Sequence, residues 1–453
     1  SLGLVGSEMC IRDSVDMDGF IDNQGNFGAD GIVGPHHEKE GSFYTIKQLW
    51  SPVQIMNTSV DKQFDGKFSV ENRYDYLNLN TCRFLWKQVK FPTATDASNT
   101  TAQVLKQGEV QGSDVAAHSA GVLDIKTTIL PDADALFLTA IDRYGHELWR
   151  WTFPVNKLNQ ANEVLSPLSN KVTSTETENE LTVKAKNHTF IFSKKDGQLK
   201  GVSVNNRKIS FANGPRFIGA RRADRSLDQF YNHDDEKAKE KDRTYSEFPD
   251  AAVFTKLDVK EDGGNLIVTA DYKLGNLDKV QWTINPNGEA VLDYTYNFSG
   301  VVDLMGICFD YPEDQVISKR WLGAGPYRVW QNRIHGTQYD VWENDYNDPI
   351  PGETFTYPEF KGYFGSVSWM NIRTKEGTIS LTNETPDAYI GVYQPRDGRD
   401  RLLYTLPESG ISVLNVIPPV RNKVNSTDLC GPSSQPKWVN GPQSGRIIFR
   451  FME

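Results

Sequence analysis

The chain has 453 residues, which is enough for two or three domains. Its 49 Lys and Arg residues against 59 Asp and Glu residues give a net charge of −10, and a surface of this sign repels the phosphates of nucleic acids. Aromatic residues make up 11% of the chain, which argues against disorder over most of its length. No apolar run approaches the roughly 20 residues that a membrane-spanning helix needs. We therefore expect neither nucleic acid nor a membrane as a partner.

The four cysteines, Cys10, Cys82, Cys308 and Cys430, are spread far apart. They form no CxxC motif and have no histidine at the spacing of a metal ligand. This pattern predicts that the cysteines are core or free thiols and argues against a zinc site or a disulfide scaffold. It does not indicate whether the chain is found in a reducing or an oxidising compartment.

The first segment, residues 1–14 (SLGLVGSEMCIRDS), lacks the charged start and long apolar core of a secretory signal, and we expect a foreign or artefactual tail. A loop rich in Gly, Asn and Asp follows. Phe43, Ile46 and Trp50 then recur at helical spacing before Pro52, which predicts a short helix. One loop and one helix over residues 15–52 cannot bury a core alone, so this helix must dock on another part of the molecule.

Residues 53–160 show the pattern of short strands, with period-two segments such as KFSVEN and turn residues between them. About seven strands without a helical stretch predict an immunoglobulin-like β-sandwich. No Cys…Trp…Cys framework is present, which excludes an antibody-type domain. Residues 161–178 are polar and rich in Asn, Ser and Thr, and we expect a linker there.

Residues 179–453 are nearly all strand, and they predict one large antiparallel β-sandwich. Two hairpins are indicated by the turn pairs Asp196-Gly197 and Asn287-Gly288. The segment GRIIFRF is the last predicted strand, and the turn-rich residues 420–443 before it predict a loop.

Several segments resemble, in order, the family 2 glycoside hydrolases of the β-galactosidase type. GNFGADGIVGP followed by WSPVQI resembles the final loop and last helix of their catalytic barrel. FSVENRYDYLNLNTCRFLWKQV resembles the sandwich domain that follows the barrel. FIFSKKDGQLKGVSVNNRKI and WLGAGPYRVWQNR resemble the large C-terminal β-domain, the small-chain module related to galactose mutarotase. The resemblance extends over residues 15–453.

This resemblance implies a mainly β protein: a remnant of a (β/α)8 barrel over residues 15–52, the immunoglobulin-like sandwich, and a galactose-mutarotase-like sandwich. It implies the C-terminal portion of a retaining enzyme that acts on O-glycosidic bonds in carbohydrate metabolism. Such an enzyme needs two carboxyl groups about 5–5.5 Å apart, and in the family both lie on earlier barrel strands. We therefore expect a fragment truncated within the barrel, inactive alone, that supports the barrel and lines the rim of its sugar site.

The resemblance also implies partners and ions for the intact enzyme. The partners are a β-galactoside or related carbohydrate and the missing N-terminal domains, in a parent that is homo-oligomeric. Phe27 matches the aromatic residue that offers its carbonyl to a monovalent cation and its ring to the substrate, and Asp30 matches a further cation ligand. Sodium, with magnesium elsewhere, is the implied cofactor, and we expect no tight binding by the fragment. The alternative is that Asp30 caps a turn before Gly31.

Trp438 is the third candidate for contact with the substrate. A loop near this end of the family's β-domain sends an aromatic ring into the sugar site, and the C–H faces of sugars stack on such rings. The alternative is a tryptophan that fills the end of the sandwich. His36 and His37 precede the predicted helix, and we expect them to form hydrogen bonds on a surface.

Two other functions are open at this stage. The chain can be a stand-alone carbohydrate-binding β-protein that uses Trp438. It can also be an aldose-1-epimerase-like enzyme, which needs a histidine and a carboxylate that face each other. His188, His233 and His335 are the histidines of the large module, and none lies in a recognisable motif.

Overall fold

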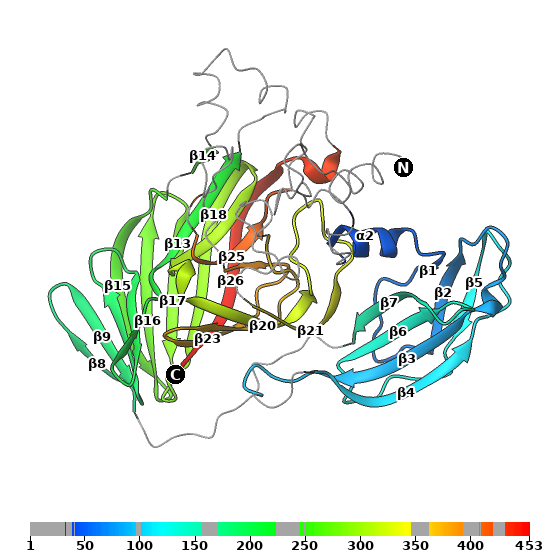
Figure 1. Cartoon of the computed structure of the whole chain (residues 1–453). Helices are drawn as coiled ribbons and strands as arrows, with labels where there is room; N and C mark the ends of the chain where they lie inside the picture. Colours follow the sequence, from blue (N-terminus) through cyan, green and yellow to red (C-terminus); the bar gives the residue numbers. More distant parts are fainter. Residues whose placement is uncertain are drawn as a thin grey trace, which may run out of the picture.

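The computed structural model describes residues 32, 39, 41–96, 101–155, 171–222, 245–248, 250–345, 362–392, 407, 409–419 and 431–453. The protein is mainly β, as the sequence predicts, with a smaller and a larger body of strands (Figure 1). The described α-helix, α2 (Gly41–Leu49), lies between the two bodies. Short 3-10 turns occur at Leu79–Thr81, Glu313–Gln315 and Pro432–Ser434.

The smaller body consists of two sheets from residues 53–155. One sheet has the order β1 (Val53–Ile55), β2 (Lys67–Asn72) and β5 (Ser119–Asp124). The other has the order β4 (Gln103–Gln111), β3 (Arg83–Lys90), β6 (Ala135–Ile141) and β7 (Glu147–Pro154). Side chains of both sheets share one core, in which the rings of Phe68 and Phe153 lie 5.1 Å apart. The seven strands agree with the predicted number.

The larger body also consists of two sheets, both antiparallel. The ten-stranded sheet follows the order β24 (Tyr389–Gly391), β25 (Ile411–Val416), β19 (Leu304–Asp310), β13 (Ala212–Arg222), β11 (Leu199–Val204), β10 (His188–Ser193), β9 (Glu180–Ala185) and β8 (Thr173–Glu176), with β12 (Arg207–Ile209) on β11 and β14 (Tyr245–Glu247) on β13. The nine-stranded sheet follows the order β15 (Val253–Asp262), β16 (Asn265–Lys273), β17 (Leu277–Ile284), β18 (Ala290–Val302), β26 (Lys437–Met452), β23 (Gly377–Asn383), β22 (Trp369–Thr374), β20 (Val316–Gly325) and β21 (Gln338–Asp345).

An aromatic core joins these two sheets into a sandwich. Phe309 of the ten-stranded sheet lies 6.1 Å from Trp282 and 5.6 Å from Phe449 of the nine-stranded sheet, measured between ring centroids. All three are buried, and such ring pairs add to the stabilisation from burial. Both predicted hairpins are confirmed as β10–β11 and β17–β18, and Gly288 has the positive φ of +86° that its turn requires.

Two strands differ from the sequence prediction. β26 begins at Lys437, so residues 437–443 are strand and not the end of a loop, and it lies inside the sheet between β18 and β23. Every side chain in the first part of β26 is partly or well exposed. The sequence there lacks the buried apolar residues at every second position by which a strand is predicted. β8 lies within the predicted linker, and all four of its side chains are exposed.

The helix α2 docks on both bodies, as expected for a helix without a core of its own. On the larger body, Thr45 Oγ1 donates to the carbonyl of His335 at 2.9 Å, and the Gly336 N–H donates to Gln48 Oε1 at 2.6 Å. On the smaller body, Lys47 Nζ lies 2.9 Å from Glu147 Oε1. That residues 15–52 belong to a barrel stays a prediction.

The two sandwiches also meet directly. The indole Nε1 of Trp369 in β22 donates to the carbonyl of Pro92 at 3.0 Å, and Arg150 Nη2 of β7 lies 2.9 Å from Asp340 Oδ2 of β21. An apolar cluster joins both bodies at this point, and its buried members are Val89, Phe91, Ala94, Ala135, Phe137, Leu322 and Trp369. We call these residues the junction.

The described thiols agree with the sequence prediction. Cys82 and Cys308 are buried and free, and burial raises the pKa of Cys308 to about 11, while Cys10 and Cys430 lie outside the described residues. Among the described helices, none has the length and apolar character to cross a membrane.

Candidate functional site

The predicted cation site cannot be placed in the fold. Phe27 and Asp30 lie outside the described residues, as do His36 and His37. Within the described part of the chain, no group of three His, Cys, Asp or Glu residues is arranged to hold a metal ion. The sodium and magnesium sites stay predictions.

Trp438 lies at the start of β26, opposite Val301 of β18, and its side chain is 71% exposed. A ring with this exposure does not fill the end of the sandwich, so the structural alternative for Trp438 is wrong. Most of the side chain is therefore open to solvent, which is the state that stacking on a sugar requires.

Polar side chains continue from Trp438 along the outer face of β18 and β26. Ser299 Oγ donates to Asn440 Oδ1 at 2.7 Å, and one step further Thr295 Oγ1 and Ser444 Oγ are 3.2 Å apart. These pairs combine donors and acceptors beside an exposed ring, which is the chemistry of a carbohydrate-binding surface. We call Trp438 with these four residues the polar strip.

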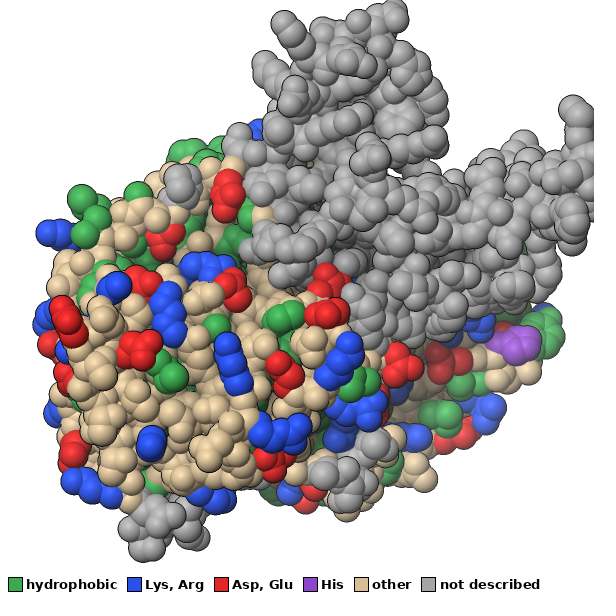
Figure 2. Space-filling model, turned by 60° about the vertical axis from the view of Figure 1, so that its left-hand side comes forward, with side chains coloured by type: hydrophobic (Ala, Val, Ile, Leu, Met, Phe, Trp, Pro, Cys, Tyr) green, Lys and Arg blue, Asp and Glu red, His purple; other side chains and the backbone are tan. Residues whose placement is uncertain are grey.

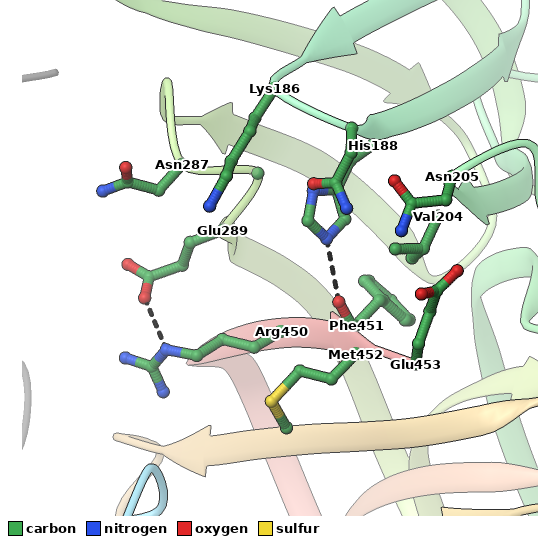
Figure 3. Close-up of a pocket in the computed structure, with 12 residues that line it drawn as sticks. Lys186, His188, Val204, Asn205, Asn287, Glu289, Arg450, Phe451, Met452 and Glu453 are labelled. Carbon is green, nitrogen blue, oxygen red and sulfur yellow. Dashed lines mark hydrogen bonds and ion pairs between the residues drawn. The ribbon is translucent and has the colours of Figure 1, made fainter.

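A pocket of about 300 Å³ opens at the other end of the large sandwich (Figure 3). Three turns and the end of β26 form it, and its lining includes Lys186, His188, Asn205, Asn287, Glu289 and Arg450. Sequence reasoning missed this pocket because its residues are far apart in the chain and lie in ordinary hairpin turns. The only sequence signal was the Asn-Gly pair at 287–288.

Two of the pocket's titratable side chains already have partners. His188 Nε2 lies 2.8 Å from the carbonyl of Phe451, and Glu289 Oε2 lies 2.7 Å from Arg450 Nε, with both members of this ion pair largely buried (Figure 3). An aldose epimerase needs a histidine and a carboxylate that are free to exchange protons with the sugar. The pocket brings a histidine and a carboxylate together, but the described contacts hold each of them in place.

Two other described carboxylates lie near one another at the surface and share one cation. Asp293 and Glu384 both contact Arg446, at 3.1 and 3.2 Å, and all three are partly or well exposed. On the described part of the face in Figure 2, basic and acidic side chains are interspersed, with no area of a single sign.

The fold and these surfaces define a mainly β protein that is built from two β-sandwiches. Residues 184–416, about half of the chain, match the sequence profile of the β-galactosidase small chain. The chain therefore belongs to the β-galactosidase small chain family. This confirms the small-chain module within the large sandwich, while the wider assignment to family 2 and the truncation stay predictions.

Solved structures give weaker similarities. A galactose 1-epimerase from Lactobacillus acidophilus NCFM is 10% identical, with a TM-score of 0.36, over 63% of this chain and 99% of that chain. The YeaD protein from Salmonella typhimurium is 9% identical, with a TM-score of 0.30, over 65% and 97%. Both scores are low, so the fold description rests on the sheets themselves and on the family match. No protein with a curated description matches the chain.

Proposed function

We propose that this chain supplies the supporting β-domains of a β-galactosidase-like glycoside hydrolase, which acts on O-glycosidic bonds in carbohydrate metabolism. The match of residues 184–416 to the β-galactosidase small chain carries this proposal. In it, Phe27, Asp30 and Trp438 contribute to the rim of the sugar site, and Phe27 and Asp30 also hold sodium. The high exposure of Trp438 supports its part of this role.

The proposal assigns the hydrolytic step to another part of the enzyme. A retaining mechanism uses two carboxyl groups about 5–5.5 Å apart on either side of the bond that breaks. Glu289, the carboxylate most enclosed by the pocket, is paired with Arg450 at 2.7 Å and would have to leave this cation to act as a nucleophile. The proposed catalytic pair therefore belongs to a barrel in the N-terminal domains, which act as the partner of these sandwiches.

The exposed end of α2 supports a partner at this position. Leu49 and Trp50 are 48% and 74% exposed, directly beside the residues through which α2 docks. Neighbouring exposed apolar side chains mark contact surfaces, and a barrel packed against α2 would cover them.

The DNA directly upstream tests this proposal. We expect an open reading frame, continuous with residue 15, that encodes a barrel with two catalytic glutamates. The enzyme expressed from that frame should hydrolyse nitrophenyl β-galactoside, and Trp438→Ala should raise its KM more than it lowers kcat. An in-frame stop codon directly upstream of a natural start would contradict the proposal.

A stand-alone carbohydrate-binding protein is the second candidate, and the polar strip favours it. The strip offers a ring and hydrogen-bonding groups without any further domain. Calorimetric titration with methyl β-galactoside should then show saturable binding that Trp438→Ala abolishes. Trp50→Ala is the matched control, because Trp50 is equally exposed but lies at α2, and it should leave binding unchanged.

A further inference from the structure

The pocket at the turn end of the large sandwich differs from the rest of the core, because it joins the two sheets through polar groups. The β9–β10 and β11–β12 turns come from the ten-stranded sheet, and the β17–β18 turn and the end of β26 come from the nine-stranded sheet. Trp438 lies twelve residues before Arg450 on the same strand, which corresponds to roughly 40 Å. The pocket is therefore separate from the polar strip.

His188 leaves one polar atom of the pocket without a partner. The side chain is 92% buried, and its Nε2 must carry the proton because the carbonyl of Phe451 can only accept. Nδ1 of the neutral ring is then an acceptor, and no donor for it is found among the described residues. A buried acceptor of this kind normally receives a hydrogen bond. Here Nδ1 is covered by the β17–β18 turn at Gly288 and does not face the opening, so His188 contributes a fixed, incompletely bonded wall to the pocket.

Other polar groups of the pocket are also unused by the fold. Within the described part of the chain, the side chains of Lys186, Asn205 and Asn287 make no hydrogen bond or ion pair, although all three line the pocket. Figure 3 shows the Lys186 side chain extending between Asn287 and His188. These groups supply donors as well as acceptors.

The charges of the pocket indicate the class of ligand. Lys186 and Arg450 are cationic and Glu289 and Glu453 are anionic, so the charged side chains of the lining balance. The exposed surface of the lining is mostly apolar, with a few donors and acceptors, and this combination suits a neutral molecule that has both C–H faces and hydroxyl groups more than it suits an anion or a metal ion. The volume of 300 Å³ equals about ten water molecules, which accommodates one pyranose ring with its hydroxyl groups.

We propose that this pocket, lined by Lys186, His188, Asn205, Asn287, Glu289 and Arg450, binds one neutral monosaccharide. Lys186, Asn205 and Asn287 donate to and accept from the sugar hydroxyl groups at the open side, and the Glu289–Arg450 ion pair forms the fixed wall. The site does not depend on the proposed hydrolase function, since none of its residues belongs to the rim at Trp438.

The β11–β12 turn offers a matched pair of variants. Asn205 and Asn206 are neighbours with positive φ values of 48° and 64°, which glycine adopts without strain, but only Asn205 lines the pocket. Both Asn205→Gly and Asn206→Gly should therefore fold. Loss of a hydrogen-bonding side chain predicts binding weaker by about fivefold or more in Asn205→Gly and unchanged binding in Asn206→Gly.

The measurement is a calorimetric titration of the full chain with galactose and, separately, with inorganic phosphate. We expect saturable galactose binding that is retained in Asn206→Gly and weakened in Asn205→Gly, and no binding of phosphate. Absence of galactose binding, equal binding by both turn variants, or binding of phosphate in its place would overturn the proposal. Galactose binding lost only in Trp438→Ala would also overturn it, and would instead support a sugar site at the polar strip.

Discussion

The junction and the turn-end pocket are both places where separate sheets meet, yet they use different chemistry. At the junction, Trp369 and Phe91 are buried, and the Trp369 indole has its partner in the Pro92 carbonyl. At the pocket, the side chains of Lys186 and Asn205 are exposed and make no hydrogen bond or ion pair within the described residues. The junction is thus held mainly by buried apolar side chains, whereas the pocket has exposed polar side chains that the fold does not use.

Buried polar side chains of the smaller sandwich and of the pocket differ in a similar way. Asn72 of the smaller sandwich donates to the carbonyls of Leu77 and Val115, both at 2.9 Å, and accepts from the Tyr74 N–H at 3.0 Å. The side-chain amide of Asn72 therefore uses both its NH2 group and its oxygen in hydrogen bonds within the protein. His188 is buried as well, but only one of its nitrogens has a partner. A fully bonded buried group such as Asn72 indicates a structural role, whereas the unpaired nitrogen of His188 is a buried polar atom that the fold leaves unsatisfied.

The largest effect is expected from Trp369→Ala at the junction. Removal of a fully buried tryptophan costs about 3–5 kcal/mol, and here the cavity opens between the two sandwiches. We expect differential scanning calorimetry to show two separate transitions in place of one. A single transition at an unchanged temperature would show that the sandwiches do not stabilise each other through this contact.

Variants of Asn72 and His188 should lower the free energy of unfolding by different amounts, and both losses should be smaller than that of Trp369→Ala. Asn72→Leu removes three hydrogen bonds, two to the carbonyls of Leu77 and Val115 and one from the Tyr74 N–H, and should lower the free energy of unfolding by about 2–4 kcal/mol. His188→Phe loses a single hydrogen bond to Phe451 and should cost about 1 kcal/mol. Urea denaturation of both variants provides the comparison, and an equal or larger cost for His188→Phe would mean that this ring has a mainly structural role.

Alkaline pH should weaken the junction through Tyr339, which packs against it with its ring 5.6 Å from that of Phe91. Burial raises the pKa of Tyr339 to about 12, while an unfolded tyrosine has a pKa near 10. Between these values the unfolded chain loses the proton first, so the contribution of Tyr339 is complete below about pH 10 and is lost as the pH rises toward 12. The melting temperature of Tyr339→Phe should fall less steeply over this range than that of the unmodified protein. The exposed Tyr144 provides a control, because Tyr144→Phe should leave the slope unchanged.

The smallest effect is expected from Trp50→Ala. This ring is 74% exposed, so its removal should change the free energy of unfolding of this chain by less than about 0.5 kcal/mol, in contrast to Trp369→Ala. Thermal denaturation checks this value. A loss of several kcal/mol would show that the end of α2 is already covered and would remove its support for a missing partner.

Period-two patterns and turn pairs predicted most of the fold. The β17–β18 hairpin followed from Asn287-Gly288 and from buried residues such as Trp282 and Leu292 at every second position. The first half of β26 could not be predicted, because its exposed polar residues lack this pattern and its pairing with β18 spans more than a hundred residues. The pocket was hidden for a similar reason, since only folding brings His188, Glu289 and Arg450 together.

The candidate site was predicted less completely than the fold. Trp438 could be selected because exposed tryptophans suit sugars, but its place on a polar strand face depends on a register that sequence does not define. The family resemblance identified the small-chain module, which the profile match over residues 184–416 confirms.

Hydrolysis of nitrophenyl β-galactoside by the purified chain tests the central claim most directly. The account predicts no release of nitrophenol above the rate in buffer, because the proposed function places the two carboxyl groups that break the bond in another part of the enzyme. Rapid, saturable turnover by this chain alone, abolished by Glu289→Gln, would contradict the account and would place the catalytic centre in the turn-end pocket.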